Sequence, residues 1–224
     1  MSKLLHLAEV TKSYGDLVAL GGVSLGVAPG QRVALMGLNG SGKTTLLRIA
    51  AGLLEPTKGK VVVADHDAGS LGARAAVSYI PDSPVLYDDL SVVEHLEYVS
   101  RLHGAHRWEP RAVDLMERLG LVARADDLPS TFSRGLRQKV SIALAFVRPF
   151  RVLLVDEPFV GLDQPGRATL LELLSEAAEA EAAVVVSTHQ TEYLGQASRC
   201  VGLRDGHVMY DGKPTSQAEK EILG

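Results

Sequence analysis

A glycine-rich segment near residue 40 has the composition of a phosphate-binding loop. Residues 37–44 read GLNGSGKT and match the pattern G-x-x-x-x-G-K-[ST]. The glycines let backbone N–H groups approach phosphate oxygens, Lys43 adds a full charge for the β- and γ-phosphates, and the Thr44 hydroxyl suits Mg²⁺. The segment therefore predicts a nucleotide site formed by Gly37, Leu38, Asn39, Gly40, Ser41, Gly42, Lys43, Thr44 and Thr45.

Two carboxylates follow an apolar segment later in the chain. Residues 152–158 read VLLVDEP, which predicts a buried strand ending in Asp156 and Glu157 before a proline stops it. At the carboxyl end of a parallel strand, Asp156 can hold Mg²⁺, and Glu157 can face the γ-phosphate and deprotonate the attacking water. We therefore expect Glu157 and Lys43 to be catalytic, and Asp156 and Thr44 to be metal ligands.

Strands and helices of an α/β fold must position these residues. Residues 4–33 alternate short apolar strands with turn signals, which predicts an antiparallel β region. Strands that alternate with helices elsewhere predict a mainly parallel sheet with right-handed crossovers. The expected elements there are a strand at 31–36, a helix at 44–54, a strand at 152–156, a helix at 167–180, a strand at 182–188 and a hairpin around 204–210.

The middle of the chain predicts three helices with no strand between them. Ser91 and Glu94 have the spacing of a capping box ahead of the first, and the others are expected at about 110–119 and 133–147. We expect a single domain over 1–224, with a core subdomain at about 1–82 and 150–224 and a helical subdomain at about 83–149.

Composition narrows the function classes. The 224 residues carry a net charge of −4, which gives no extended basic face for nucleic acid. The single cysteine, Cys200, excludes an intrachain disulfide and a thiolate metal cluster. The sequence begins without a signal-peptide pattern, and no apolar run approaches the roughly 20 residues that a membrane span needs. We expect a cytoplasmic protein, unless a partner holds it at a membrane.

The phosphate loop alone does not decide among the proteins that carry one. A GTPase would need an N-K-x-D sequence to read guanine, but the only asparagine is Asn39, inside the loop. A small-molecule kinase would need an acceptor pocket and an arginine-rich lid, and the sequence has no recognisable candidate for either.

A third segment carries a resemblance to a known family. Residues 131–146 read TFSRGLRQKVSIALAF, shortly before VLLVDEP, and at this point the chain resembles the ABC ATPases over essentially its whole length. The family signature is usually LSGGQ. Here Ser133 and Gly135 match it, while Phe132, Arg134 and Leu136 replace Leu, Gly and Gln. Ser133 would open a helix whose N–H groups can face an anion, which in relatives is the γ-phosphate held by the opposite subunit.

The resemblance implies roles for four more residues. Tyr14 lies where relatives stack a ring on adenine, and Asp163, in GLD at 161–163, resembles a residue that contacts the second subunit. His189 resembles a catalytic histidine at the γ-phosphate. Asp82 occupies the position of a glutamine in relatives, in a loop near Mg²⁺ and the membrane partner. We expect Asp82 to act at the metal through an intervening water.

The resemblance also implies a function. The chain would be the ATP-binding and hydrolysing motor subunit of an ABC transporter, with ATP and Mg²⁺ bound. Its partners would be a separate transmembrane permease subunit and a second ATPase subunit placed head to tail, as a homodimer or a heterodimer, with no nucleic acid. It would lie on the inner face of the cell membrane, where Val85, Leu86 and Tyr87 are candidate contacts for the permease.

The sequence leaves two questions open: the direction of transport, and whether the protein is a transport or a non-transport ATPase. The sequence SRGLRQK resembles that of bacterial export-type cassettes, which favours export. The rival is a non-transport ABC ATPase acting on ribosomes or DNA. Such relatives typically carry two cassettes in one chain, or long coiled-coil or basic insertions, and this sequence has neither feature.

Overall fold

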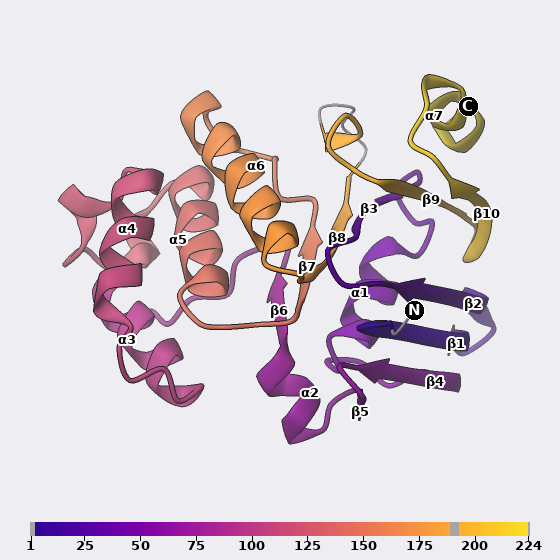
Figure 1. Ribbon diagram of the computed structural model, residues 1–224, viewed down its shortest axis with the longest axis horizontal. Helices are drawn as coiled ribbons and strands as arrows, with labels where there is room; N and C mark the ends of the chain where they lie inside the picture. Colours follow the sequence, from indigo (N-terminus) through magenta and orange to yellow (C-terminus); the bar gives the residue numbers. More distant parts are fainter. Residues whose placement is uncertain (1–2, 189–192, 224) are drawn as a thin grey trace. The chain divides into compact units, whose positions relative to one another are not determined.

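The first strands form an antiparallel sheet. The computed structural model describes residues 3–188 and 193–223. The sheet has the order β2-β1-β4-β5 (Figure 1), and its strands are β1 (Leu5–Tyr14), β2 (Leu17–Val27), β4 (Lys58–Val63) and β5 (His66–Asp67). The β1–β2 hairpin confirms the antiparallel region expected from residues 4–33. Strand β4 was not predicted, because the first half of KGKVVV holds two lysines and a glycine, and the segment becomes a strand by pairing with β1 (Leu7 opposite Val61).

The second sheet is mainly parallel, as expected. Its order is β10-β9-β3-β8-β7-β6, and the strands are β3 (Arg32–Met36), β6 (Val77–Ile80), β7 (Val152–Asp156), β8 (Ala183–Ser187), β9 (Arg199–Arg204) and β10 (His207–Gly212). Strand β8 pairs in parallel with both β3 and β7, which places Ser187 opposite Leu35 on one side and Asp156 on the other. The carboxyl ends of these three strands therefore meet at one edge of the sheet.

The chain divides into two compact units. Unit 1 comprises Met1–Tyr79, Phe150–Glu157 and Leu174–Gly224, and unit 2 comprises Ile80–Pro149 and Pro158–Leu173. The helices that lie wholly in unit 1 are α1 (Lys43–Ala50), α2 (Leu71–Ala76) and α7 (Ser216–Leu223). Helix α1 is shorter than the expected 44–54, because Gly52 adopts a left-handed φ of 72° and a side chain there would overlap the backbone of Gly69.

Unit 2 is helical. It contains α3 (Val92–Leu102), α4 (Glu109–Leu119), α5 (Arg134–Phe146) and the first part of α6 (Gln164–Glu179), with short 3₁₀ turns at Val122–Arg124 and Pro129–Thr131. The expected capping box is present at α3: Ser91 Oγ accepts from Glu94 N, and Glu94 Oε2 accepts from Ser91 N at 2.7 Å. Helix α6 begins three residues before the predicted start at 167, because Asp163 caps it.

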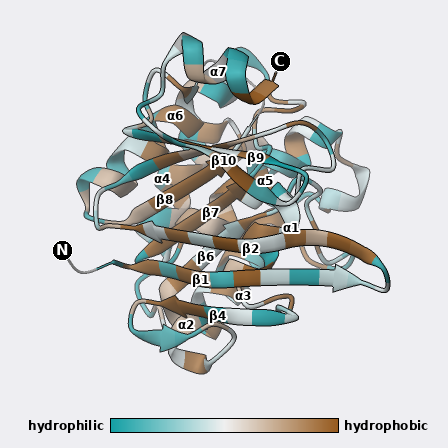
Figure 2. Ribbon diagram, turned by 90° about the vertical axis from the view of Figure 1, so that its right-hand side faces the viewer, coloured by the Kyte–Doolittle hydropathy of each residue, from teal (hydrophilic) through white to brown (hydrophobic). Residues whose placement is uncertain are grey.

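Each unit buries its own apolar side chains. In unit 1, Leu35, Leu46 and Leu154 belong to a continuous core that joins the two sheets through α1. Figure 2 shows the hydrophobic residues, in brown, along β7 and β8. In unit 2, Leu96 and Leu115 are fully buried where α3, α4 and α5 pack together. Among the helices of the described residues, none has both the length and the apolar content needed to cross a membrane.

Candidate nucleotide-binding site

The predicted phosphate loop connects the end of β3 to the start of α1. Gly42 is the N-cap of α1 with a φ of 104°, a left-handed conformation that glycine adopts without strain. A side chain at Gly37 would overlap the Leu203 carbonyl oxygen, and one at Gly42 would lie 2.8 Å from the Ala19 carbonyl oxygen. These two glycines are thus required by the surrounding backbone, in addition to any need for close approach by phosphate.

Lys43 is held inside the loop that precedes it. Lys43 is 6% exposed, and its Nζ donates to the carbonyl oxygens of Gly37 at 2.7 Å and Leu38 at 3.3 Å. The same Nζ lies 3.6 Å from Glu157 Oε1. A buried ammonium needs such partners. The structure therefore brings together Lys43 and Glu157, two of the residues predicted to be catalytic, from distant parts of the sequence.

Asp156 is buried at the carboxyl end of β7 with one oxygen uncommitted. Ser187 Oγ donates to Asp156 Oδ1 at 2.5 Å, whereas Oδ2 has no hydrogen-bond partner of good geometry within the described chain. Ser41 Oγ, in the phosphate loop, is also buried and unpartnered among the described residues. Buried polar atoms are nearly always paired, so these two atoms point to a ligand that completes the site.

The donor set fits a Mg²⁺ ion shared with phosphates. No group of three or more His, Cys, Asp or Glu side chains that could hold a metal occurs within residues 3–188 and 193–223. Mg²⁺ usually takes only one or two carboxylates and completes its shell with waters and phosphate oxygens. The free oxygen of Asp156 and the exposed hydroxyl of Thr44 match that smaller protein contribution.

Glu157 has an unusual backbone conformation. Its φ is 44°, in the left-handed region that non-glycine residues seldom occupy. Its N–H donates to both the carbonyl oxygen and the Oγ of Ser187, each at 3.1 Å. Strain of this kind is often found where a side chain must be aimed at a ligand.

Ser187 thus holds both the Asp156 carboxylate and the backbone of Glu157, a role that the sequence analysis missed. The residue is fully buried at the end of β8, and its hydroxyl donates to Asp156 while accepting from Glu157 N. The available signal was a serine closing an otherwise apolar strand, but its meaning depends on the pairing of β8 with β7.

Tyr79 is a second residue that the sequence analysis missed. Burial, reinforced by the negative charge of Asp156, raises the pKa of Tyr79 to about 12. The phenol is therefore neutral at physiological pH. Asp156, whose charge helps to raise the pKa of Tyr79, is the carboxylate proposed to hold the metal.

Tyr14 lies at the end of β1 with 51% of its surface exposed. Lys12 Nζ is 5.1 Å from the centre of its ring, close enough for a cation–π interaction. The exposure suits the predicted stacking on adenine, which remains a prediction.

The signature residues belong to unit 2. Ser133 is the N-cap of α5, as expected, and its Oγ accepts from Leu136 N at 3.4 Å. A side chain at Gly135 would overlap the carbonyl oxygen of Gly161. Gly135 is therefore required by a backbone contact inside its own unit, a reason that differs from the expected need for an uncluttered anion site.

Asp163 has partners within its own unit. Its Oδ1 accepts from Gly166 N at 2.9 Å, and Oδ2 lies 2.9 Å from Lys139 Nζ. The hydrogen bond from Lys139 is the main cause that lowers the pKa of Asp163. The carboxylate therefore caps α6 and ties it to α5, and its expected contact with a second subunit remains a prediction.

Asp82 and His189 complete the set of predicted site residues. Asp82 Oδ1 lies 3.1 Å from Arg134 Nη2, an ion pair inside unit 2 that the sequence analysis did not anticipate. Its role at the metal remains a prediction. His189 lies outside the described residues.

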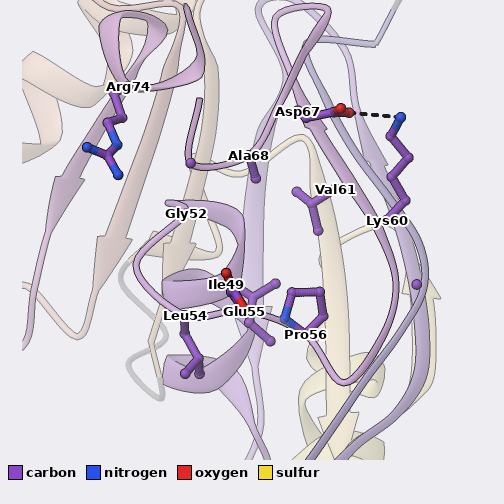
Figure 3. A pocket seen from close by; sticks show the side chains of 12 residues that line it. Ile49, Gly52, Leu54, Glu55, Pro56, Lys60, Val61, Asp67, Ala68 and Arg74 are labelled. Carbon is purple, nitrogen blue, oxygen red and sulfur yellow. Dashed lines mark ion pairs between the residues drawn. The ribbon is translucent and has the colours of Figure 1, made fainter. Parts of the chain in front are cut away.

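A separate cavity of about 440 Å³ lies elsewhere in unit 1. Its walls come from the carboxyl-terminal end of α1 and from β4 and β5, and they include Ile49, Pro56 and Val61 (Figure 3). The Lys60–Asp67 ion pair, at 2.8 Å, spans its rim. Lys43 is at the other end of α1, so this cavity is not the predicted nucleotide site.

Comparison with known proteins gives the chain its family. The family model described as "ABC transporter" matches residues 20–160. The chain is 37% identical over 190 residues to the ABC-type transporter ATP-binding protein EcsA of Bacillus subtilis (strain 168), covering 83% of this chain and 77% of the relative. It is 32% identical to the SkfA peptide export ATP-binding protein SkfE of the same organism, covering 93% and 89%.

Another relative has the opposite direction in its name. The phosphonates import ATP-binding protein PhnC of Frankia casuarinae is 39% identical, covering 90% of this chain and 87% of the relative.

Solved structures agree with the family match. An ATP-binding subunit of an ABC transporter superposes with a TM-score of 0.90 at 32% identity, covering 94% of this chain and 90% of that one. A dimeric ATP-binding cassette in a post-hydrolysis state, bound to ADP and Pi, superposes with a TM-score of 0.84 at 29% identity, covering 95% and 99%.

Proposed function

The chain belongs to the ABC transporter family as an ATP-binding subunit, and we propose that it hydrolyses ATP with Mg²⁺ to drive a separate transmembrane subunit. The observation that carries this proposal is the meeting of Lys43, Asp156 and Glu157 at one edge of the parallel sheet. Lys43 Nζ lies 3.6 Å from Glu157 Oε1, and Asp156 keeps one buried oxygen without a partner among the described residues.

Each residue at this edge has a distinct task in the proposal. The phosphate loop binds the triphosphate, and Lys43 neutralises its β- and γ-phosphates. Asp156 and Thr44 would hold Mg²⁺, which supplies further neutralisation of the phosphate oxygens. Glu157 accepts a proton from the attacking water, and its Oε1 lies 3.6 Å from Lys43 Nζ in the phosphate loop. Ser187 holds the Asp156 carboxylate and the backbone of Glu157 in place.

The signature residues are proposed to act on ATP bound by a second ATPase subunit. Ser133 is exposed at the N-terminus of α5, where its hydroxyl and neighbouring N–H groups can face an anion. The resemblance to a dimeric cassette supports pairing with a second ATPase subunit. We propose a head-to-tail arrangement, in which Asp163 would contact the second subunit and His189 would act on the γ-phosphate.

A permease subunit is proposed to bind unit 2, which would hold the protein on the inner face of the membrane. Val85 is 90% exposed and Tyr87 is 54% exposed, so the segment after Asp82 presents apolar side chains to a partner. We propose export, on the strength of the SRGLRQK sequence and the peptide export relative. The import relative shows that the family match alone does not fix the direction. The relatives do not favour the ribosome or DNA alternative.

The functional division into a core subdomain (1–82 and 150–224) and a helical subdomain (83–149) is part of the same proposal. The first would bind and hydrolyse ATP, and the second would contact the permease and the opposite nucleotide.

Three variants test the catalytic assignment. Lys43→Ala should abolish Mg²⁺-dependent ATPase activity and weaken nucleotide binding, because it removes the charge at the phosphates. Glu157→Gln should abolish hydrolysis but keep binding. Lys60→Ala is the matched control, since Lys60 is an exposed lysine of the same unit whose partner is Asp67. Full hydrolysis by the Glu157→Gln protein would exclude Glu157 as the base.

A further inference from the structure

Two residues that depart from the family pattern contact each other. Asp82 replaces the usual glutamine, Arg134 replaces the first glycine of the signature, and Arg134 Nη2 lies 3.1 Å from Asp82 Oδ1. The side chains are 45% and 55% exposed. The charge introduced at one position is therefore neutralised by the charge introduced at the other, 52 residues along the chain.

Arg134 also lies against the loop that precedes α6. Its Cγ and Cδ are 3.6 and 3.7 Å from the position that a Cβ on Gly161 would occupy. The stem of Arg134 thus runs along the backbone of Gly161 before its guanidinium reaches Asp82. A single side chain contacts the loop at Asp82 on one side and the loop at Gly161 on the other.

The rest of the α5 N-terminus is anchored to the same two loops. Lys139 pairs with Asp163, and Arg137 Nη2 donates to the Pro84 carbonyl oxygen at 3.5 Å. A cavity of about 400 Å³ lies beside these side chains and is lined by Ser83, Pro84, Phe132, Arg134 and Arg137. Arg134 borders this cavity, and its contact with Asp82 is the ion pair.

We propose that Arg134 is a positioning residue that couples the Asp82 loop to the signature residues Ser133 and Gly135. Arg134 lies between these two in sequence, so a displacement of Asp82 would be transmitted directly to the first turn of α5. This inference rests on the proposed function, in which Ser133 and Gly135 contact ATP on a second subunit. It assigns Asp82 a task at Arg134 that does not require contact with the metal.

A double-mutant cycle in the Glu157→Gln protein tests the proposal. Asp82→Asn, Arg134→Gln and the double variant are compared by the dissociation constant of the ATP–Mg²⁺ dimer, measured by sedimentation. We expect each single change to raise that constant about two- to fivefold, the range for a half-exposed ion pair. The double variant should be no worse than either single one, and Asp82→Arg with Arg134→Asp should restore most of the loss.

Salt and a control pair separate coupling from general effects of charge. The difference between variants should shrink at about 1 M salt, where the Debye length falls to about 3 Å. Glu97→Gln with Arg101→Gln removes another exposed ion pair of unit 2, on α3, and should leave the dimer constant unchanged. Circular dichroism of every variant checks that the fold is retained.

Three results would overturn the proposal. Additive effects of Asp82→Asn and Arg134→Gln would mean that the two residues act independently, for example Asp82 at the metal and Arg134 on the opposite nucleotide. No effect of either change would mean that the ion pair does not act on assembly. Failure of the charge swap to recover any of the loss, in a folded protein, would also count against coupling. If the Glu157→Gln protein itself does not dimerise with ATP, the proposed function fails instead.

Discussion

Replacing Ser187 with alanine should remove the hydroxyl that links the Asp156 carboxylate to the backbone of Glu157 at the sheet edge. The hydroxyl donates to the buried Asp156 at 2.5 Å and accepts from Glu157 N at 3.1 Å. A hydrogen bond to a charged group contributes about 1.5–3 kcal/mol, and a buried carboxylate left without its donor loses that whole contribution. We therefore expect Ser187→Ala to lower the free energy of unfolding by about 1.5–3 kcal/mol.

The same change should weaken metal binding. A side chain that orients a metal ligand is typically worth a factor of about 10–100 in metal affinity. The Mg²⁺ concentration for half-maximal ATPase activity should rise by roughly that factor, since Asp156 would no longer be held in one orientation.

Ser100→Ala is a matched control for Ser187→Ala. Ser100 is also fully buried, but its hydroxyl has no hydrogen-bond partner among the described residues. Its removal takes away no hydrogen bond within the described chain, so Ser100→Ala should not lower the free energy of unfolding by this route. Urea denaturation measures both variants, and ATPase titration with Mg²⁺ measures the metal dependence. If Ser187→Ala matches Ser100→Ala in both assays, the positioning role of Ser187 is wrong.

Three further predictions concern the other site residues. Gly135→Ala should destabilise the protein by about 1–3 kcal/mol in urea denaturation even without nucleotide, because its Cβ overlaps the Gly161 carbonyl oxygen; an effect seen only with ATP would contradict this. Tyr14→Ala should weaken ATP binding by about 1–3 kcal/mol in a titration, whereas Tyr14→Phe should not; equal affinities would exclude stacking. The pKa of Asp163 is lowered in the folded state, so its ion pair with Lys139 stabilises the protein above pH about 4, and this stabilisation is lost as the pH falls below that value. Asp163→Asn should therefore make the free energy of unfolding fall less steeply with decreasing pH. An unchanged pH dependence would refute this.

Local signals made parts of the fold predictable. The capping box at Ser91 and the phosphate loop around Lys43 are each formed by residues a few positions apart, so the local sequence is enough to predict them. Strand β4 has no such signal, because Lys58–Val63 begins with two lysines around a glycine and becomes a strand by pairing with β1, about fifty residues earlier. Helix α1 ended early for a similar reason, the close contact between Gly52 and Gly69.

Some residues of the candidate site could likewise be predicted from local motifs, whereas others could not. Lys43, Asp156 and Glu157 follow from motifs, and the parallel sheet then brings them together. Ser187 did not follow, because its role depends on the register between β7 and β8 rather than on its neighbours in sequence. The pairing of Asp82 with Arg134 was equally hidden, since each residue was noted as a departure but nothing local linked them.

The geometry of α5 explains which signature positions this chain keeps and which it changes. Ser133 is retained where a side chain must cap the helix, and Gly135 is retained where any side chain would overlap the Gly161 carbonyl oxygen. Arg134, between them, is more than half exposed and has room to run along Gly161 to Asp82. The glycine usual at position 134 is therefore not required by packing within this unit. An arginine is tolerated there, and Asp82 gives its charge a partner.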